Sequence, residues 1–123
     1  MFHKISFENK SQIIEVIKSY EGYKNRQPLI IGIDGSTRTT KTNLAYYLGY
    51  SLIIEVINLD HFITPQLGYV GSFKNNQFFK RKVEKFYKNR TMIIEGICLL
   101  EILDYFGINP DILIYCKRIK PNT

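Results

Sequence analysis

The sequence predicts an α/β domain in which a parallel sheet has helices on both faces. Short, continuous apolar runs recur along the 123-residue chain, as in strands buried on both sides. Segments with helical spacing of apolar side chains separate these runs. The apolar fraction of 45% is too high for a disordered chain. We therefore expect one domain over residues 1–123, with an N-terminal helix and linker at 1–26 and a core at 27–117.

The N-terminal segment is expected to form an amphipathic helix over residues 9–23. Ile13, Val16, Ile17 and Tyr20 stand at positions i, i+3, i+4 and i+7. This spacing places them on one face of a helix, which can then pack against the core.

A strand, a helix and a second strand are expected next. The run QPLIIGI at 27–33 is short and apolar, which is typical of a buried strand. The segment KTNLAYYLGY at 41–50 places Leu44 and Leu48 on one helical face. The run SLIIEVINL at 51–59 is the second expected strand.

The rest of the chain repeats this alternation after a connecting segment. A proline and two glycines in FITPQLGYVGS predict a loop at 62–72. Helical spacing then places Phe79, Val83, Phe86 and Tyr87 on one face. The elements expected beyond the loop are a helix at 75–89, a strand at 91–97, a short helix at 99–107 and a strand at 110–117.

The chain is basic, with a formal net charge of +6. The segment KRKVEKFYKNR at 80–90 carries six positive charges against one negative charge. Such a surface attracts polyanions, but a helix face that is simply solvated explains the same pattern.

Cysteine use and hydropathy indicate a cytoplasmic protein without a membrane segment. Cys98 and Cys116 lie in apolar segments of the sequence, so buried thiols are expected rather than a disulfide or a pair of metal ligands. No apolar run approaches the roughly 18 residues that would cross a bilayer. The N-terminus has no apolar core of a secretory signal.

The stretch GIDGSTRTTKT at 32–42 resembles a phosphate-binding loop, whose pattern is G-x-x-x-x-G-K-[ST]. It lies between an expected strand and an expected helix, which is the required context. Backbone N–H groups of such a loop surround phosphate oxygens, and the helix N-terminus adds positive potential. An ordinary strand-to-helix turn with a capping threonine is the alternative. The expected phosphate-binding residues are Gly35, Ser36, Thr37, Arg38, Thr39, Thr40, Lys41 and Thr42.

One position departs from the pattern, because Thr40 stands where the second glycine is expected. A β-branched residue is strained at positive φ, at a cost of roughly 1–3 kcal/mol. We therefore expect Thr40 to weaken phosphate binding without abolishing it.

Three segments in this order resemble the uridine kinase-like P-loop kinases, the superfamily of phosphoribulokinase, pantothenate kinase and nicotinamide riboside kinase. They are IGIDGSTRTTKTNLA, INLDHF and MIIEGICLL, each at the end of an expected strand. The resemblance covers roughly residues 27–117. It implies a three-layer P-loop NTPase-like fold and ATP-dependent transfer of the γ-phosphate to a small-molecule hydroxyl, with Mg²⁺ as the second cofactor.

The resemblance also implies roles for individual residues. Lys41 would contact the terminal phosphates, and Thr42 would bind Mg²⁺. Asp60 would lie near the acceptor hydroxyl and Mg²⁺, where a carboxylate can accept or orient the hydroxyl proton. Glu95 would hold Mg²⁺ through water or orient the substrate. The expected catalytic residues are thus Asp60, Lys41 and Glu95, and the expected metal ligands are Thr42, Asp60 and Glu95.

Other residues that follow the second strand are candidate substrate contacts. His61 stands where the family often has aspartate or serine, although a loop histidine is more often structural. Phe62 and Tyr69 could line the acceptor pocket, although aromatic residues in such folds more often belong to the core.

The family continues past its fourth strand with an arginine-bearing lid and a fifth strand, in the order 2-3-1-4-5. Here only Lys117 and Arg118 stand where the lid would begin, so the fold is expected to be truncated after the fourth core strand. Without lid arginines, phosphoryl transfer should be slow or absent. The strand at 111–116 should then be an open edge that pairs with a second copy or a partner.

Three function classes follow from these observations. The first is an ATP-dependent kinase or the core of one, and the second is a nucleotide-binding relative without activity. The third is a basic module that binds nucleic acid. The third is the least favoured, because aromatic side chains that stack on bases must be exposed. Helical spacing places most of Phe78, Phe79, Phe86 and Tyr87 in the core.

Overall fold

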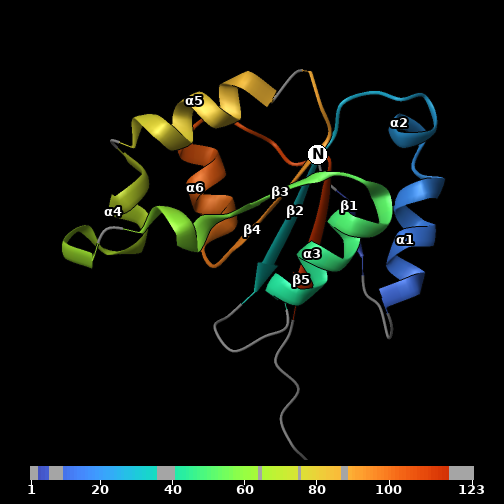
Figure 1. The fold of residues 1–123 in the computed structure, drawn as a ribbon, viewed down its shortest axis with the longest axis horizontal. Coiled ribbons are helices and arrows are strands. Elements are labelled where there is room, and N and C mark those ends of the chain that lie inside the picture. The colour runs from blue at the N-terminus through green and yellow to red at the C-terminus, as the bar shows by residue number, and fades with distance from the viewer. Residues whose placement is uncertain are drawn as a thin grey trace, which may run out of the picture.

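Five parallel strands form one sheet with helices on both faces (Figure 1). The computed structural model describes residues 3–5, 10–35, 41–63, 65–74, 76–86 and 89–116, without the side chains of 3–5, 10, 65, 69, 70, 74 and 86. The strands are β1 (His3–Ile5), β2 (Ile30–Gly35), β3 (Glu55–Asn58), β4 (Met92–Gly96) and β5 (Ile112–Cys116). The α/β class with a parallel sheet is therefore confirmed.

The strand order is β1-β5-β2-β4-β3. The four strands expected from the sequence thus lie in the order 2-3-1-4 that the family resemblance implies. The edge of β5 is not open, however, because β1 pairs with it in parallel, with His3 opposite Ile112 and Ile5 opposite Ile114. The expectation of an open edge at 111–116 is therefore wrong, whereas self-association or partner binding, which was expected from that edge, stays a prediction.

Helices and short 3₁₀ turns connect the strands. The helices are α1 (Lys10–Ser19), α2 (Glu21–Lys24), α3 (Lys41–Leu52), α4 (Gly68–Lys74), α5 (Gln77–Phe86) and α6 (Leu99–Tyr105). The 3₁₀ turns are η1 (Leu59–Phe62) and η2 (Pro65–Leu67). Among these described helices, none combines the length and the hydropathy that would let it span a bilayer.

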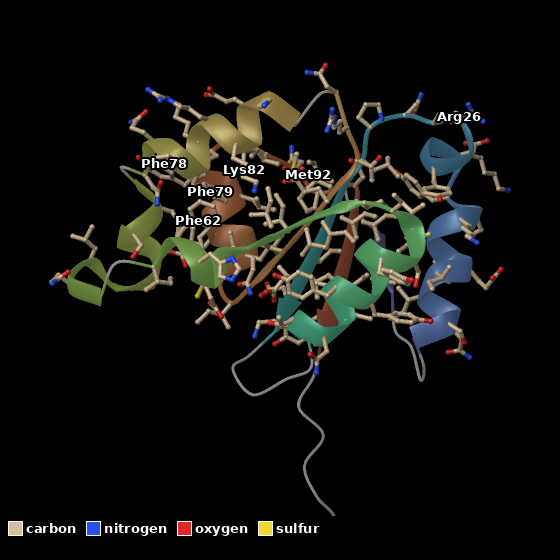
Figure 2. The ribbon with its side chains drawn as sticks, in the orientation of Figure 1. Arg26, Phe62, Phe78, Phe79, Lys82 and Met92 are labelled. Carbon is tan, nitrogen blue, oxygen red and sulfur yellow. The ribbon has the colours of Figure 1, made fainter. Side chains whose placement is uncertain are left out.

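One core lies between the sheet and helices α4, α5 and α6. Phe79 of α5 packs edge-on against Phe73 of α4, with ring centroids 5.0 Å apart. Phe79 also contacts Phe62 of η1 at 5.2 Å, and both side chains point into this side of the molecule in Figure 2. Met92 of β4 belongs to the same cluster, so the aromatic layer anchors η1 directly on the sheet.

The second core lies on the opposite face, under α1 and α3. Ile31 and Ile33 of β2 point into it, whereas Ile30 points into the first core. This alternation explains why β2 reads as a continuous apolar run: both of its faces are covered. Ile17 of α1 and Leu48 of α3 are fully buried against it.

Two glycines allow helices to approach the sheet closely. A Cβ on Gly32 of β2 would lie 2.8 Å from Leu99 Cδ2, at the start of α6. A Cβ on Gly49 of α3 would lie 2.5 Å from Val56 Cγ2 of β3. A Cβ on Gly49 would also lie 2.9 Å from the Ile54 carbonyl oxygen, so packing against backbone requires glycine there, whereas a Cβ on Gly32 would displace only the end of the Leu99 side chain.

The structure corrects several expected boundaries. The first helix is interrupted at Tyr20 and continues as α2. Helix α3 extends to Leu52, so only 55–58 of the second expected strand is sheet. The expected loop at 62–72 contains η2 and most of α4, where Gly71 is accommodated inside a helix. The N-terminal segment also supplies β1, so it is more than a helix and a linker.

Candidate functional site

The carboxyl ends of β2, β4 and β5 lie at the same edge of the sheet, because neighbouring strands are parallel. Helix α3 begins at this edge, near the end of the β2 arrow in Figure 1. Ligands of open parallel sheets bind in this region. The structure therefore brings the two expected site segments after β2 and β4 to one place.

Gly35 ends β2 where it meets β5. A Cβ at this position would lie 2.6 Å from the carbonyl oxygen of Cys116, so only glycine fits beside the β5 backbone. The Gly35 N–H donates a hydrogen bond to Oδ1 of Asp34 at 2.8 Å. The first residue of the expected phosphate loop is thus fixed by both strand packing and a local hydrogen bond.

Lys41 and Thr42 form the first turn of α3. Lys41 is only 7% exposed, which is rare for a lysine and requires polar surroundings. The Thr42 hydroxyl lies 3.2 Å from both carboxylate oxygens of Glu95 at the end of β4. The expected metal-binding threonine therefore lies directly beside the expected acidic residue, and the expected phosphate-contacting lysine is within electrostatic range of it.

Glu95 is 1% exposed, and burial raises the pKa of its carboxyl group above the ordinary value. The hydrogen bond from Thr42 opposes this effect, and the positive charges of Lys41 and His61 also lower the pKa. The negative charge of Asp60 raises it. Charged groups on two elements, Lys41 of α3 and Asp60 and His61 of η1, therefore affect the pKa of Glu95.

Asp60 is held by the turn that follows β3. Its backbone N–H donates a hydrogen bond to the Oδ1 of Asn58 at 2.9 Å, and Asn58 is itself 9% exposed. Asn58 caps the N-terminus of η1 through this hydrogen bond. The side chains of Asp60 and His61 are exposed, whereas Phe62 packs into the aromatic core. Asp60 and His61 can therefore be reached from solvent while their backbone is anchored.

Part of the expected site lies outside the described residues. This concerns the loop residues Ser36, Thr37, Arg38, Thr39 and Thr40, and also Lys117 and Arg118. The side chain of Tyr69, an expected contact of the acceptor, lies outside them as well. Among the described positions, the site consists of Gly35, Lys41, Thr42, Asp60 and Glu95.

A metal ion at this edge would have few protein ligands. The described residues contain no group of three or more His, Cys, Asp and Glu side chains that could hold one. Mg²⁺ does not require such a group, because it keeps several waters and is usually bound through one or two carboxylates together with substrate phosphates. Thr42 and Glu95 supply oxygen atoms of the right chemical type.

The two cysteines have different positions, and both are free thiols. Cys98 is exposed, in the turn between β4 and α6, with φ at 53°. The expectation of a buried thiol is wrong there, because this turn projects beyond the sheet. Cys116 is half-buried at the end of β5, where burial raises the pKa of its thiol. Lys41, Glu95 and Asp34 also act on that pKa, and Cys116 lies opposite Gly35, next to the site.

Asn58 and Asp34 were not among the residues predicted from the sequence. Each is a polar residue at or near the end of an apolar strand. Asn58 accepts a hydrogen bond from the backbone N–H two residues ahead, and Asp34 accepts one from the N–H of the next residue. The signal that could have identified Asn58 is the Asx turn, in which Asn or Asp bonds to the backbone two residues on.

Comparison with known proteins identifies no relative. No protein-family model matches the chain, no curated protein matches it, and no solved structure matches it.

Proposed function

We propose that the chain is the nucleotide-binding core of an ATP-dependent phosphotransferase that uses a small-molecule hydroxyl as acceptor. The strand order β3-β4-β2-β5 and the start of α3 at the end of β2 are the arrangement expected for a P-loop kinase. The observation that carries the proposal is the contact between Thr42 and Glu95, with the buried Lys41 next to Thr42 in the sequence.

Thr42 and Glu95 supply oxygen atoms of the type that Mg²⁺ prefers. The Thr42 hydroxyl lies 3.2 Å from each oxygen of Glu95. Thr42 and Glu95 would hold the ion, with Asp60 as the third candidate ligand. Bound there, Mg²⁺ would neutralise charge on the phosphates.

The chain's own side chains supply the remaining functions. Lys41, almost excluded from water, would pair with a terminal phosphate in a low-dielectric setting, where such an interaction is strong. Asp60 is exposed and lies within electrostatic range of Glu95. It would accept or orient the proton of the acceptor hydroxyl. Asn58 would keep Asp60 in position through the hydrogen bond to its backbone.

Isothermal titration with ATP and Mg²⁺ tests the nucleotide site. Lys41→Ala should lower ATP affinity at least tenfold, because it removes the buried cation. Lys80→Ala on the exposed face of α5 removes the same charge at a distance and is the matched control. Thermal unfolding of both variants shows whether the fold is retained. Equal ATP affinity of wild type and Lys41→Ala would contradict the proposal.

Turnover with a panel of nucleosides and vitamins tests the chemistry. Asp60→Asn should lower kcat at least 100-fold with little change in ATP affinity. A chain that binds ATP but phosphorylates no member of the panel would instead be a nucleotide-binding relative without activity.

A further inference from the structure

A second polar hollow lies away from the candidate site, between α1, α2 and the end of α3. We call it the basic groove. Three cationic side chains line it, Lys18 of α1, Lys24 of α2 and Arg26 after α2, and its volume is about 540 Å³. Figure 2 shows Arg26 at the outer end of α2, on the opposite side of the molecule from Phe62 and Phe79. The other lining residues are Tyr23, Gln27, Leu52, Ile54 and Thr91.

The charge in this groove is of one sign. No Asp or Glu lines it, and Lys18, Lys24 and Arg26 form no ion pair with other described residues. Glu21 and Asp111 line a neighbouring hollow that shares Gln27 with the groove. Glu55 lines the surface next to Ile54, where it forms an ion pair with Lys82 of α5 at 3.2 Å. The groove therefore presents three exposed cations to any ligand that enters it.

Aromatic side chains lie in this groove and on the surface beside it. Tyr23 lines the groove itself. Tyr50 of α3, which is 90% exposed, and Ile53 line a shallow surface that adjoins the groove at Ile54. We call the groove and this adjoining surface together the α3 corner.

Ile53 has an unfavourable backbone conformation and an apolar side chain that is exposed to solvent. It is 92% exposed, and its φ of 55° lies in the left-handed region, which β-branched residues avoid. Ile53 follows the last residue of α3. The C-terminus of this helix is closed by a hydrogen bond of 2.9 Å that the Ile54 N–H donates to the Gly49 carbonyl oxygen. Helix α6 ends in the same way with Gly107 at φ 69°. A strained, exposed apolar residue is a reason to look for a ligand that covers it.

We propose that the α3 corner binds single-stranded nucleic acid. Lys18, Lys24 and Arg26 would contact backbone phosphates, and Tyr50 would stack on a base, with Ile53 against the same or the next base. A cationic groove beside exposed aromatic side chains is the combination by which proteins hold single strands without sequence preference. The structure thus supplies aromatic side chains outside the core, which the helical spacing of the sequence did not predict.

Other occupants fit this surface less well. A second copy of the chain would bring like charges together at the groove, which is unfavourable. An anionic lipid surface would suit the cations and Ile53. However, its attraction grows with the number of basic residues, and lipid-binding clusters carry about four to eight. The groove has three. Nucleic acid uses both the cations and the aromatic rings.

The first experiment measures the salt dependence of binding by fluorescence anisotropy. The probe is a labelled, mixed-sequence single strand of about 12 nucleotides, tested as RNA and as DNA. Removing three phosphate contacts should reduce the slope of log K against log salt by about 2, since each contact on single strands contributes about 0.7. The triple variant Lys18→Ala, Lys24→Ala, Arg26→Ala should also bind at least tenfold more weakly at moderate salt.

A charge-matched control separates this surface from the net charge. Lys80→Ala, Arg81→Ala, Lys85→Ala removes three exposed cations from α5, on the other face of the sheet. It should bind the strand nearly as well as wild type. Equal loss in both triple variants would mean attraction to the overall charge and would overturn the proposal.

The aromatic contact is tested by Tyr50→Ala, which should lower affinity about tenfold with an unchanged salt slope. Ile53→Gly should also bind more weakly although it relieves strain, so a loss cannot arise from unfolding. Unchanged affinity in both variants would contradict the stacking role and overturn the proposal.

Two further outcomes would also overturn it. If Lys41→Ala abolished binding of the strand, the probe would occupy the candidate phosphate site instead. If the chain bound phosphatidylserine vesicles through Lys18, Lys24 and Arg26 but did not bind the strand, the surface would be a lipid-binding site.

Discussion

At the scale of single residues, the candidate site depends on a carboxyl group buried at an energetic cost. Glu95 is 1% exposed, and its hydroxyl neighbour Thr42 offsets only part of the desolvation. A residue of this kind reduces stability while it provides chemistry, which is common at functional sites.

Glu95→Gln should therefore stabilise the fold while impairing any transfer activity. The folded-state pKa of Glu95 is raised, so between the ordinary value of 4.5 and that raised pKa the folded protein binds more protons than the unfolded chain. Wild-type stability should then fall as pH rises through this window, by about 1.4 kcal/mol for each pH unit that the window spans. Glutamine does not titrate, so the advantage of the variant should grow with pH and then level off.

Urea unfolding at a series of pH values measures this difference. Glu15→Gln on an exposed face of α1 is the control and should change the unfolding free energy by less than about 0.5 kcal/mol. A constant difference between wild type and Glu95→Gln at every pH would contradict the prediction.

Ile53→Gly should raise the unfolding free energy by about 1 kcal/mol, because glycine removes the penalty of a left-handed conformation. Little burial is lost, since Ile53 is 92% exposed. The reciprocal change, Gly107→Ala, should destabilise by about the same amount. A Cβ there meets nothing within 4 Å, so only the φ of 69° opposes it. Thermal unfolding of both variants tests the pair, and a lower Tm for Ile53→Gly would refute the strain argument.

At the scale of elements, helix α3 links the site to the sheet. Its first turn carries Lys41 and Thr42, and its last turns lie on β3 at Gly49. The position of the site residues therefore depends on how closely this helix packs.

Gly49→Ala should destabilise the protein by about 1–3 kcal/mol, although alanine is the better helix former. Its Cβ would lie 2.5 Å from Val56 Cγ2 and 2.9 Å from the Ile54 carbonyl oxygen. Gly71→Ala in α4 is the matched control, because its Cβ would come no closer than 3.6 Å to Leu67 Cβ. That variant should gain up to about 1 kcal/mol from helix propensity. If both variants changed stability alike, the close approach of α3 to β3 would be in doubt.

The elements with strong local signals could be predicted from the sequence. Strands β2, β4 and β5 read as continuous apolar runs because helices cover both of their faces. The strand β1 could not be predicted, since it is three residues long and its partner Ile112 is far away in the sequence. Helix α4 was not predicted because Gly71 and Pro65 indicate a loop locally, whereas burial of Phe73 stabilises the helix.

The site was predictable in part for a related reason. Lys41, Thr42 and Glu95 each lie directly at a strand end or helix start, where local pattern is informative. The contact between Thr42 and Glu95 depends on the pairing of β2 with β4, which the order of motifs implied. The exposure of Tyr50 and Cys98 depends on which neighbours pack around them, and no local pattern carries that information.

At the scale of the whole molecule, β1 determines whether β5 is paired on both sides or lies at the edge of the sheet. It covers Ile112, Leu113 and Ile114 of β5, which are all buried. Edge strands that are apolar and unpaired associate with other chains. We therefore expect β1 to protect the edge of β5 from pairing with another chain.

Deletion of residues 1–5 should increase self-association relative to the full chain. The deletion leaves the backbone of β5 unpaired on one side. Size-exclusion chromatography with light scattering measures the change, with the full chain at equal concentration as the control. A truncated protein that stays monomeric at high concentration would show that the β5 edge is protected by something other than β1.

The pairing of β1 with β5 also has a consequence for the time course of folding. His3 lies opposite Ile112, so β1 cannot join the sheet until β5 has been synthesised. The central strand β2 waits as well, because both of its neighbours, β4 and β5, come late in the chain. Contacts of such high sequence separation slow folding. The sheet should therefore be completed only after β5 has been synthesised, and the nascent chain should expose the apolar segments of β2 until then.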